Sequence, residues 1–183
     1  MMARNAKSCR DVEVPSVFEF ALFLVFPAAM AFAGCMDLFT MTIPNRISLA
    51  LIAAFLIIVP FAPMTWSSFG SHLGAGFLML VVGIAMFSCR LLGGGDAKLM
   101  AAAALWLGFE RLFEYLLLTA VCGGLLSAAL IMFRGMVLPP WFYTQGWAMR
   151  LHKKTGGIPY GVALAAAGLW IYPNTLWFKT FAL

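Results

Sequence analysis

The segment around which this sequence is organised is Gly93-Gly94-Gly95-Asp96-Ala97-Lys98. It interrupts a chain of 183 residues in which 63% of the residues are hydrophobic and only 10% are charged. A charged side chain beside an apolar segment is costly at membrane depth, so such a carboxylate is a candidate functional group. Between Glu19 and Glu110 the sequence holds only two acidic residues, Asp37 and Asp96. Their isolation predicts that they act as a pair.

The composition predicts an all-α, polytopic membrane protein. A mean hydropathy of +0.95 lies outside the range of ordinary soluble domains. The twelve Lys and Arg residues are scattered through the loops, which favours positive-inside topology and argues against a nucleic-acid partner. The four cysteines show no CxxC spacing, and His72 and His152 form no HExxH pattern. We therefore expect no disulfide framework, no metal and no cofactor.

Apolar runs divide the chain into about six expected transmembrane helices. Residues 1–15 form a short polar tail, and a single membrane domain covers residues 16–183. The expected spans are 16–36, 45–62, 70–92, 97–109, 112–133 and 158–178. The first run also resembles a cleavable leader, with a basic start and a small-residue pattern at Ala31 and Ala33. Glu19 and Pro27 interrupt its apolar core, which favours a retained helix.

The fourth expected span is unusually short. Its thirteen residues, 97–109, make about 20 Å of helix, against a hydrocarbon core of about 30 Å. Either the bilayer thins here or the helix begins below the membrane surface, with Asp96 at its submerged end. Non-helical backbone at that depth must be buried in protein or line a wet cavity. Glycines 93–95 then allow close backbone approach or unusual dihedral angles.

Basic residues indicate which ends of the helices face the cytoplasm. The connections after the first, third and fifth spans carry Arg46, Arg90, Lys98, Arg134, Arg150, Lys153 and Lys154. The opposite side carries Arg111, Lys179 and the three basic residues of the tail. The positive-inside rule then places the first group in the cytoplasm and both termini outside. Asp37 and Asp96 are thereby expected at the same, cytoplasmic face.

Two neighbouring carboxyl groups are suited to peptide hydrolysis. They cannot both ionise readily and therefore share one proton, so one acts as a base toward water while the other polarises the scissile carbonyl. The sequence leaves structural alternatives open. Asp96 is also a favoured helix N-cap, Asp37 a loop residue, and Lys98 either a surface anchor or an electrostatic partner of the site. Pro44 and Pro159 suit the first turns of their helices.

Three segments together resemble the type IV prepilin peptidase family of GxGD intramembrane aspartyl proteases. They are Asp37 with Ile43-Pro44-Asn45, Gly93-Gly94-Gly95-Asp96-Ala97-Lys98, and Gly157-Ile158-Pro159-Tyr160-Gly161. The resemblance implies that Asp37 and Asp96 are the catalytic pair. It also implies that the glycine loop, Lys98, Pro44, Asn45 and Pro159 bind substrate or shape the site.

This resemblance implies an enzyme that cleaves the short basic leader of prepilins or pseudopilins at the cytoplasmic face of the bacterial inner membrane. Larger family members carry a segment with paired CxxC motifs that is associated with N-methylation. The chain is similar to the compact, peptidase-only form of tight-adherence (Flp-type) pilus systems. Its oligomeric state and the identity of its prepilin stay open.

Two rival interpretations make different predictions. Proteases of the presenilin or signal-peptide-peptidase type combine GxGD with Tyr-Asp and Pro-Ala-Leu motifs, and neither occurs in this sequence. A small transporter or proton channel would use Asp37 and Asp96 as an acidic relay, as intramembrane acids often do. The second interpretation predicts ion flux without peptide cleavage.

Overall fold

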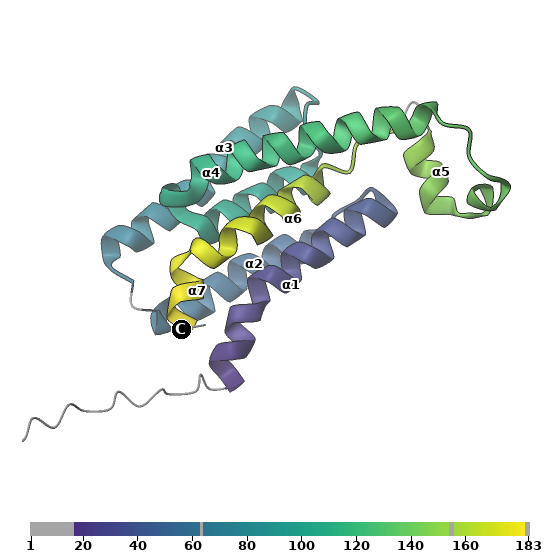
Figure 1. Ribbon diagram of the computed structural model, residues 1–183. Coiled ribbons are helices and arrows are strands. Elements are labelled where there is room, and N and C mark those ends of the chain that lie inside the picture. The colour runs from purple at the N-terminus through teal and green to yellow at the C-terminus, as the bar shows by residue number, and fades with distance from the viewer. Residues whose placement is uncertain (1–16, 63, 154–155, 182–183) are drawn as a thin grey trace, which may run out of the picture.

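The computed structural model describes residues 17–62, 64–153 and 156–181, and within these ranges it is helical with no strand. Figure 1 shows α1 (Val17–Thr40), α2 (Asn45–Ile58), α3 (Trp66–Ser88), α4 (Gly94–Gly135), α5 (Gly146–His152), α6 (Tyr160–Ile171) and α7 (Leu176–Phe181). Short 3-10 turns cover Val59–Phe61, Pro140–Thr144 and Tyr172–Asn174. The all-α class is confirmed. The expected polar tail, 1–15, lies outside the described residues.

Length and composition make two described helices suitable for crossing a membrane, namely Trp66–Ser88 and Gly94–Gly135. The apolar stretches Leu24–Thr40, within α1, and Asn45–Phe61, which is α2 with the 3-10 turn after it, are shorter. Much of the large apolar surface points outward, as at Phe77 and Phe113, which are 69% and 78% exposed. An outward apolar surface fits a helical membrane protein, because lipid is its solvent. The number of six spans stays a prediction.

Helix α4 is two helical segments joined without a loop at Gly108. This glycine has a φ of 66° and a ψ of 176°, a conformation that L side chains rarely adopt. The ring of His72 fills the space beside it, and His72 Nδ1 forms a 2.9 Å hydrogen bond with the carbonyl of Leu105. The sequence places this break at Glu110 and Arg111, whereas the structure places it just before them. The turn depends on the glycine backbone and not on the charged pair.

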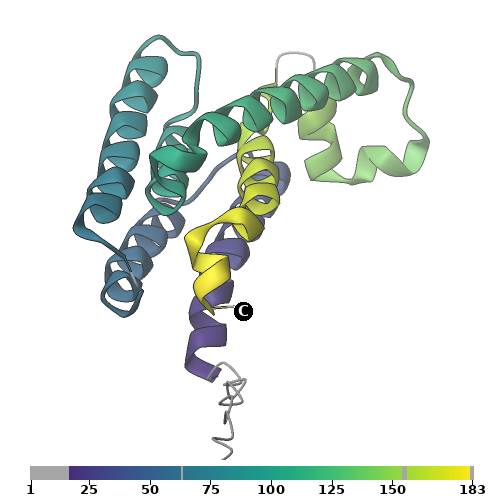
Figure 2. The ribbon, with the colours of Figure 1, turned by 60° about the vertical axis from the view of Figure 1, so that its left-hand side comes forward.

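The first segment of α4 lies antiparallel against α3. Glycines of α3 allow this close approach, because a Cβ at Gly76 would lie 3.1 Å from Leu105 Cβ, and one at Gly83 would lie 3.0 Å from Ala97 Cβ. The glycines of α3 therefore let the two helices approach closely, as small residues do between membrane helices. Helices α1 and α6 lie on the other side of α4, as Figure 2 shows.

Several other helix boundaries differ from the expected ones, and α3, for example, covers Trp66–Ser88 where the sequence predicts 70–92. Helix α1 continues to Thr40, so Asp37 lies in its last turns and not in the polar break that follows. The final expected span, 158–178, is interrupted by the 3-10 turn Tyr172–Asn174. Pro44 and Pro159 occupy the N-cap positions of α2 and α6, one residue before the first turn. Proline serves there because it donates no backbone hydrogen bond.

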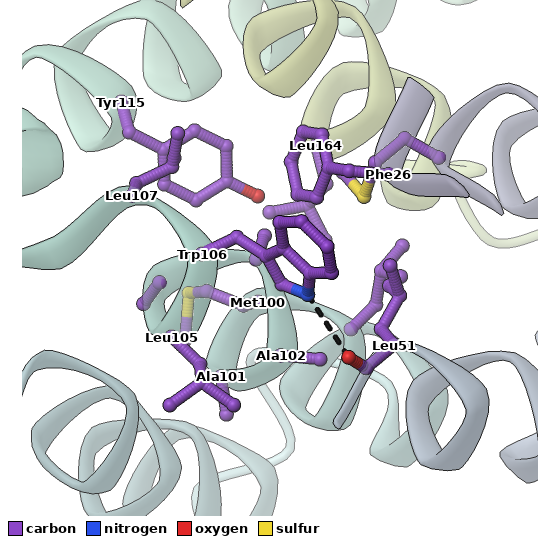
Figure 3. Packing of buried hydrophobic residues seen from close by; sticks show 14 of the residues in the cluster. Phe26, Leu51, Met100, Ala101, Ala102, Leu105, Trp106, Leu107, Tyr115 and Leu164 are labelled. Atoms are coloured by element: carbon purple, nitrogen blue, oxygen red, sulfur yellow. Dashed lines mark hydrogen bonds between the residues drawn. The ribbon is translucent and has the colours of Figure 1, made fainter. Parts of the chain in front are cut away.

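An aromatic core holds the helices together away from their polar ends. Trp106 is 1% exposed, and its Nε1 donates a 2.9 Å hydrogen bond to the carbonyl of Leu51 on α2, as Figure 3 shows. Trp177 Nε1 donates in turn to the carbonyl of Trp106 at 2.6 Å. Phe26 of α1 packs against the same indole, with ring centroids 5.4 Å apart. This core lies about 15 Å along the helices from Asp37 and Asp96 and fixes where their ends meet.

Candidate active site

A cleft of about 1200 Å³ opens where the end of α1 meets the beginnings of α4 and α6. Asp37 and Asp96 both line it, together with Arg90, Arg134 and Tyr160. The cleft thus unites residues from four separate parts of the sequence. The structure places the two isolated aspartates at one site, as the sequence predicts.

Asp37 is held by a backbone donor from the far end of the chain. Its side chain is 5% exposed, and Oδ2 accepts a 2.7 Å hydrogen bond from the N–H of Gly161, the second residue of α6. Helix α1 ends shortly afterwards, at Thr40, and the next residue, Met41, has a φ of 56° and donates its N–H to the backbone carbonyl of Asp37 at 2.8 Å. This left-handed residue turns the chain toward Pro44. The Gly161 bond fixes the side-chain carboxyl of Asp37, and the Met41 bond fixes its backbone.

Asp96 occupies the first turn of α4 but is not its N-cap, which is Gly93. Its carboxyl interacts electrostatically with Asp37 and with the backbone of Gly93 and Gly161. The contact with Gly93 resembles the back-reaching half of a capping box. Asp96 can therefore stabilise the beginning of α4 and also lie beside Asp37. One oxygen, Oδ1, is buried and has no hydrogen-bond partner among the described residues, so a polar group bound there would offset its desolvation.

Ile43 joins the three motif segments. A Cβ at Gly95 would lie 3.1 Å from Ile43 Cβ and 3.2 Å from its carbonyl oxygen. A Cβ at Gly161 would lie 2.6 Å from Ile43 Cδ1 and 2.9 Å from Asp37 Oδ2. Gly94 faces Phe87 instead. Glycines 93–95 have no positive φ, so close approach and not unusual geometry explains them.

Lys98 and Asn45 lie outside this cleft. Lys98 Nζ donates a 2.9 Å hydrogen bond to Asn45 Oδ1, and both residues line a separate groove between α2, α3 and α4. Two residues along a helix correspond to a rotation of about 200°, so Lys98 lies on the opposite face of α4 from Asp96. The groups that interact with the Asp96 carboxyl do not include Lys98. Lys98 therefore neither lines the aspartate cleft nor pairs with Asp96 in this structure.

One arginine holds the segment that carries Gly161, and a second joins α5 to the end of α1. Arg134, at the end of α4, donates from Nε to the carbonyl of Leu151 at 2.8 Å and from Nη2 to that of Gly157 at 2.7 Å. Arg150 of α5 donates to the carbonyl of Phe39, beside Asp37. From the sequence alone, both arginines indicate only topology. The sequence also does not identify the N–H of Gly161 as a donor to Asp37, although Gly161 closes the third motif.

The arrangement has the chemistry of an acid–base pair. Two neighbouring carboxyl groups can share one proton, and such a pair can activate a water while polarising a carbonyl. Within the described residues no group of three or more His, Cys, Asp or Glu side chains gathers as a metal site would. The acidic side chains that line the cleft are those of Asp37 and Asp96.

Comparisons with known proteins agree with this geometry. Residues 24–128, which contain both aspartates, match the type IV leader peptidase family. A "Prepilin leader peptidase/N-methyltransferase" of Aeromonas salmonicida (strain A449) is 28% identical over 160 residues, 80% of this chain and 48% of that protein. One of Aeromonas hydrophila is 33% identical over 93 residues, 49% of this chain and 27% of that protein.

The chain spans about half or less of the length of these curated relatives. No solved structure matches it. The family match covers more than half of the chain and includes α4 up to Ala128 together with the Asp37 end of α1. The chain belongs to the type IV leader peptidase family.

Proposed function

We propose that this protein is a membrane-embedded aspartic endopeptidase that removes the short basic leader of prepilins or pseudopilins at the cytoplasmic face. One observation carries the proposal. Asp37 and Asp96, 59 residues apart in sequence, line the same cleft. The family supports the substrate class, and the peptidase named in the relatives supports the reaction. The N-methyltransferase activity in those names is not part of this proposal.

The proposed reaction is general acid–base hydrolysis. The ionised member of the pair takes a proton from water as the water oxygen attacks the scissile carbonyl. The protonated member donates a hydrogen bond to the carbonyl oxygen as negative charge develops there. When the tetrahedral intermediate collapses, the C–N bond breaks and the departing amine receives a proton. The two aspartates exchange protonation states during the cycle and titrate as one unit.

The location of the cleft suits a substrate with a basic leader and an apolar helix. The helix would lie in the bilayer beside the protein, and its junction with the leader would reach the level of the aspartates. The cleft lies where α1 and α3 end and α4 begins. Met41 turns the backbone there with a φ of 56°, and Arg90 does so with a φ of 59°. Arg90 is exposed and Met41 is half-buried, so an extended peptide could reach the cleft at these turns.

The decisive experiment follows the size of a co-expressed prepilin with wild-type protein, Asp37→Asn and Asp96→Asn. Asparagine keeps the shape of the side chain and removes the titrating proton. Glu114→Gln is the matched control, because this acid of α4 pairs with exposed Arg111 outside the cleft. We expect the wild type and the control to shorten the prepilin, and both aspartate variants to insert in the membrane without cleaving it.

Normal cleavage by either asparagine variant would overturn the paired mechanism. A wild type that cleaves no prepilin, yet conducts protons in vesicles only when both aspartates are present, would favour the acidic relay.

A further inference from the structure

The groove that contains Lys98 is distinct from the aspartate cleft. It has a volume of about 370 Å³ and lies between α2 and α3, with the first segment of α4 as its floor. A volume in this range, about 300–1,000 Å³, is typical of small-molecule sites. Helices α2 and α3 each pack on α4 but scarcely contact one another, which leaves a wedge between them. Figure 2 shows this separation.

The groove is polar at one end and apolar along its length. Its walls include Ile52 of α2 and Leu73, Phe77 and Leu80 of α3, all exposed by at least 38%. Lys98 lies at the polar end, and Leu105, seven residues further along α4, lies about 10 Å away. An apolar channel of this kind fits a hydrocarbon chain that runs parallel to the helices.

The polar end offers a cation and donors for an anionic head. Lys98 is exposed and forms no ion pair among the described residues, and its hydrogen-bond partner is the neutral amide of Asn45. Ser48 lines the same end, is 4% exposed, and its buried Oγ has no hydrogen-bond partner in the described chain. Basic pockets between membrane helices bind anionic lipid head groups.

We propose that this groove binds one anionic phospholipid, with its phosphate at Lys98 and an acyl chain between α2 and α3. A zwitterionic lipid of the same chain length binds less tightly because its ammonium offsets the phosphate charge. The lipid lies on the opposite face of α4 from Asp96. This proposal does not depend on the reaction at the cleft.

Native mass spectrometry of the full chain, released from detergent, tests the preference for the head group. The probes are phosphatidylglycerol and phosphatidylethanolamine with identical acyl chains. We expect the wild type to retain phosphatidylglycerol preferentially, and Lys98→Gln to lose about fivefold of that preference. Lys98→Arg keeps the charge and retains the preference, and Lys153→Gln, an exposed lysine outside the groove, leaves it unchanged. An unchanged preference in Lys98→Gln would refute the site.

Photo-crosslinking identifies the occupant of the groove. A p-benzoylphenylalanine at Phe77 lies in the groove wall. One at Phe113, which is similarly exposed, lies on the second segment of α4 and outside the groove. We expect the Phe77 probe to capture phosphatidylglycerol in preference to phosphatidylethanolamine, and the Phe113 probe to capture both equally. Capture of a prepilin helix or of a second copy of this chain at Phe77 would overturn the lipid assignment, as would equal capture of the two lipids.

Discussion

The N–H of Gly161 and the carboxyl of Asp37 form a 2.7 Å hydrogen bond across 124 residues of sequence. The bond fixes one oxygen of Asp37 against the beginning of α6, beside Asp96. It exists because Gly161 has no side chain, so that the α6 backbone can approach α1 closely.

Gly161→Ala should reduce prepilin cleavage by roughly 10- to 100-fold. The new Cβ would lie 2.6 Å from Ile43 Cδ1 and 2.9 Å from Asp37 Oδ2, so it must displace the carboxyl, and small displacements at a reacting group cost about this much. Cleavage rate in membranes measures the effect. The control is Gly124→Ala, which meets nothing within 4 Å. Equal losses in the two variants would contradict the proposed contact.

Ile43→Val should partly restore cleavage to Gly161→Ala but not to Gly95→Ala. Valine lacks Cδ1, the atom that the Gly161 Cβ would meet first, but keeps Cβ and the carbonyl oxygen that a Gly95 Cβ would approach at 3.1 Å and 3.2 Å. A double-mutant cycle on cleavage rate measures both couplings. Rescue of both glycine variants, or of neither, would show that Ile43 does not join the segments as described.

Arg134→Gln should destabilise the segment of residues 156–161, which carries Gly161. It removes the bonds to the carbonyls of Leu151 and Gly157, and because the side chain is only half-buried we expect a loss of ~1–2 kcal/mol of unfolding free energy. Hydrogen exchange of residues 156–161 should accelerate. Arg111→Gln, which breaks an exposed pair with Glu114, should cost under about 1 kcal/mol and leave that exchange unaltered. Unchanged exchange in Arg134→Gln would refute its positioning role.

Gly108→Ala should destabilise the protein by about 1–3 kcal/mol, because its φ of 66° is strained for alanine and a Cβ would lie 3.0 Å from His72 Nε2. Thermal unfolding in detergent measures the loss. Gly70→Ala in α3 meets nothing within 4 Å and should be neutral or slightly stabilising. A Gly108→Ala protein as stable as Gly70→Ala would show that α4 does not need its glycine turn.

Sequence reasoning brought Asp37 and Asp96 together because isolated carboxylates are conspicuous in an apolar chain and basic residues indicate topology. The sequence does not show that the Gly161 N–H donates to Asp37, because almost every residue type has a backbone N–H. The break in α4 was placed at Glu110 and Arg111, since charge is visible in sequence whereas the dihedral angles of Gly108 are not. The position of Lys98 opposite Asp96 follows from helical rotation and was available from the sequence once α4 was known to begin before Asp96.

The long sequence separation between Asp37 and Gly161 has a consequence for the biogenesis of this protein. During synthesis Asp37 emerges first, Asp96 follows, and the donor that fixes Asp37 arrives only with α6. A nascent chain that has not yet reached residue 161 therefore has both acids but no fixed pair. The cleft can therefore be completed only after α6, the second-to-last of the described helices, has been synthesised.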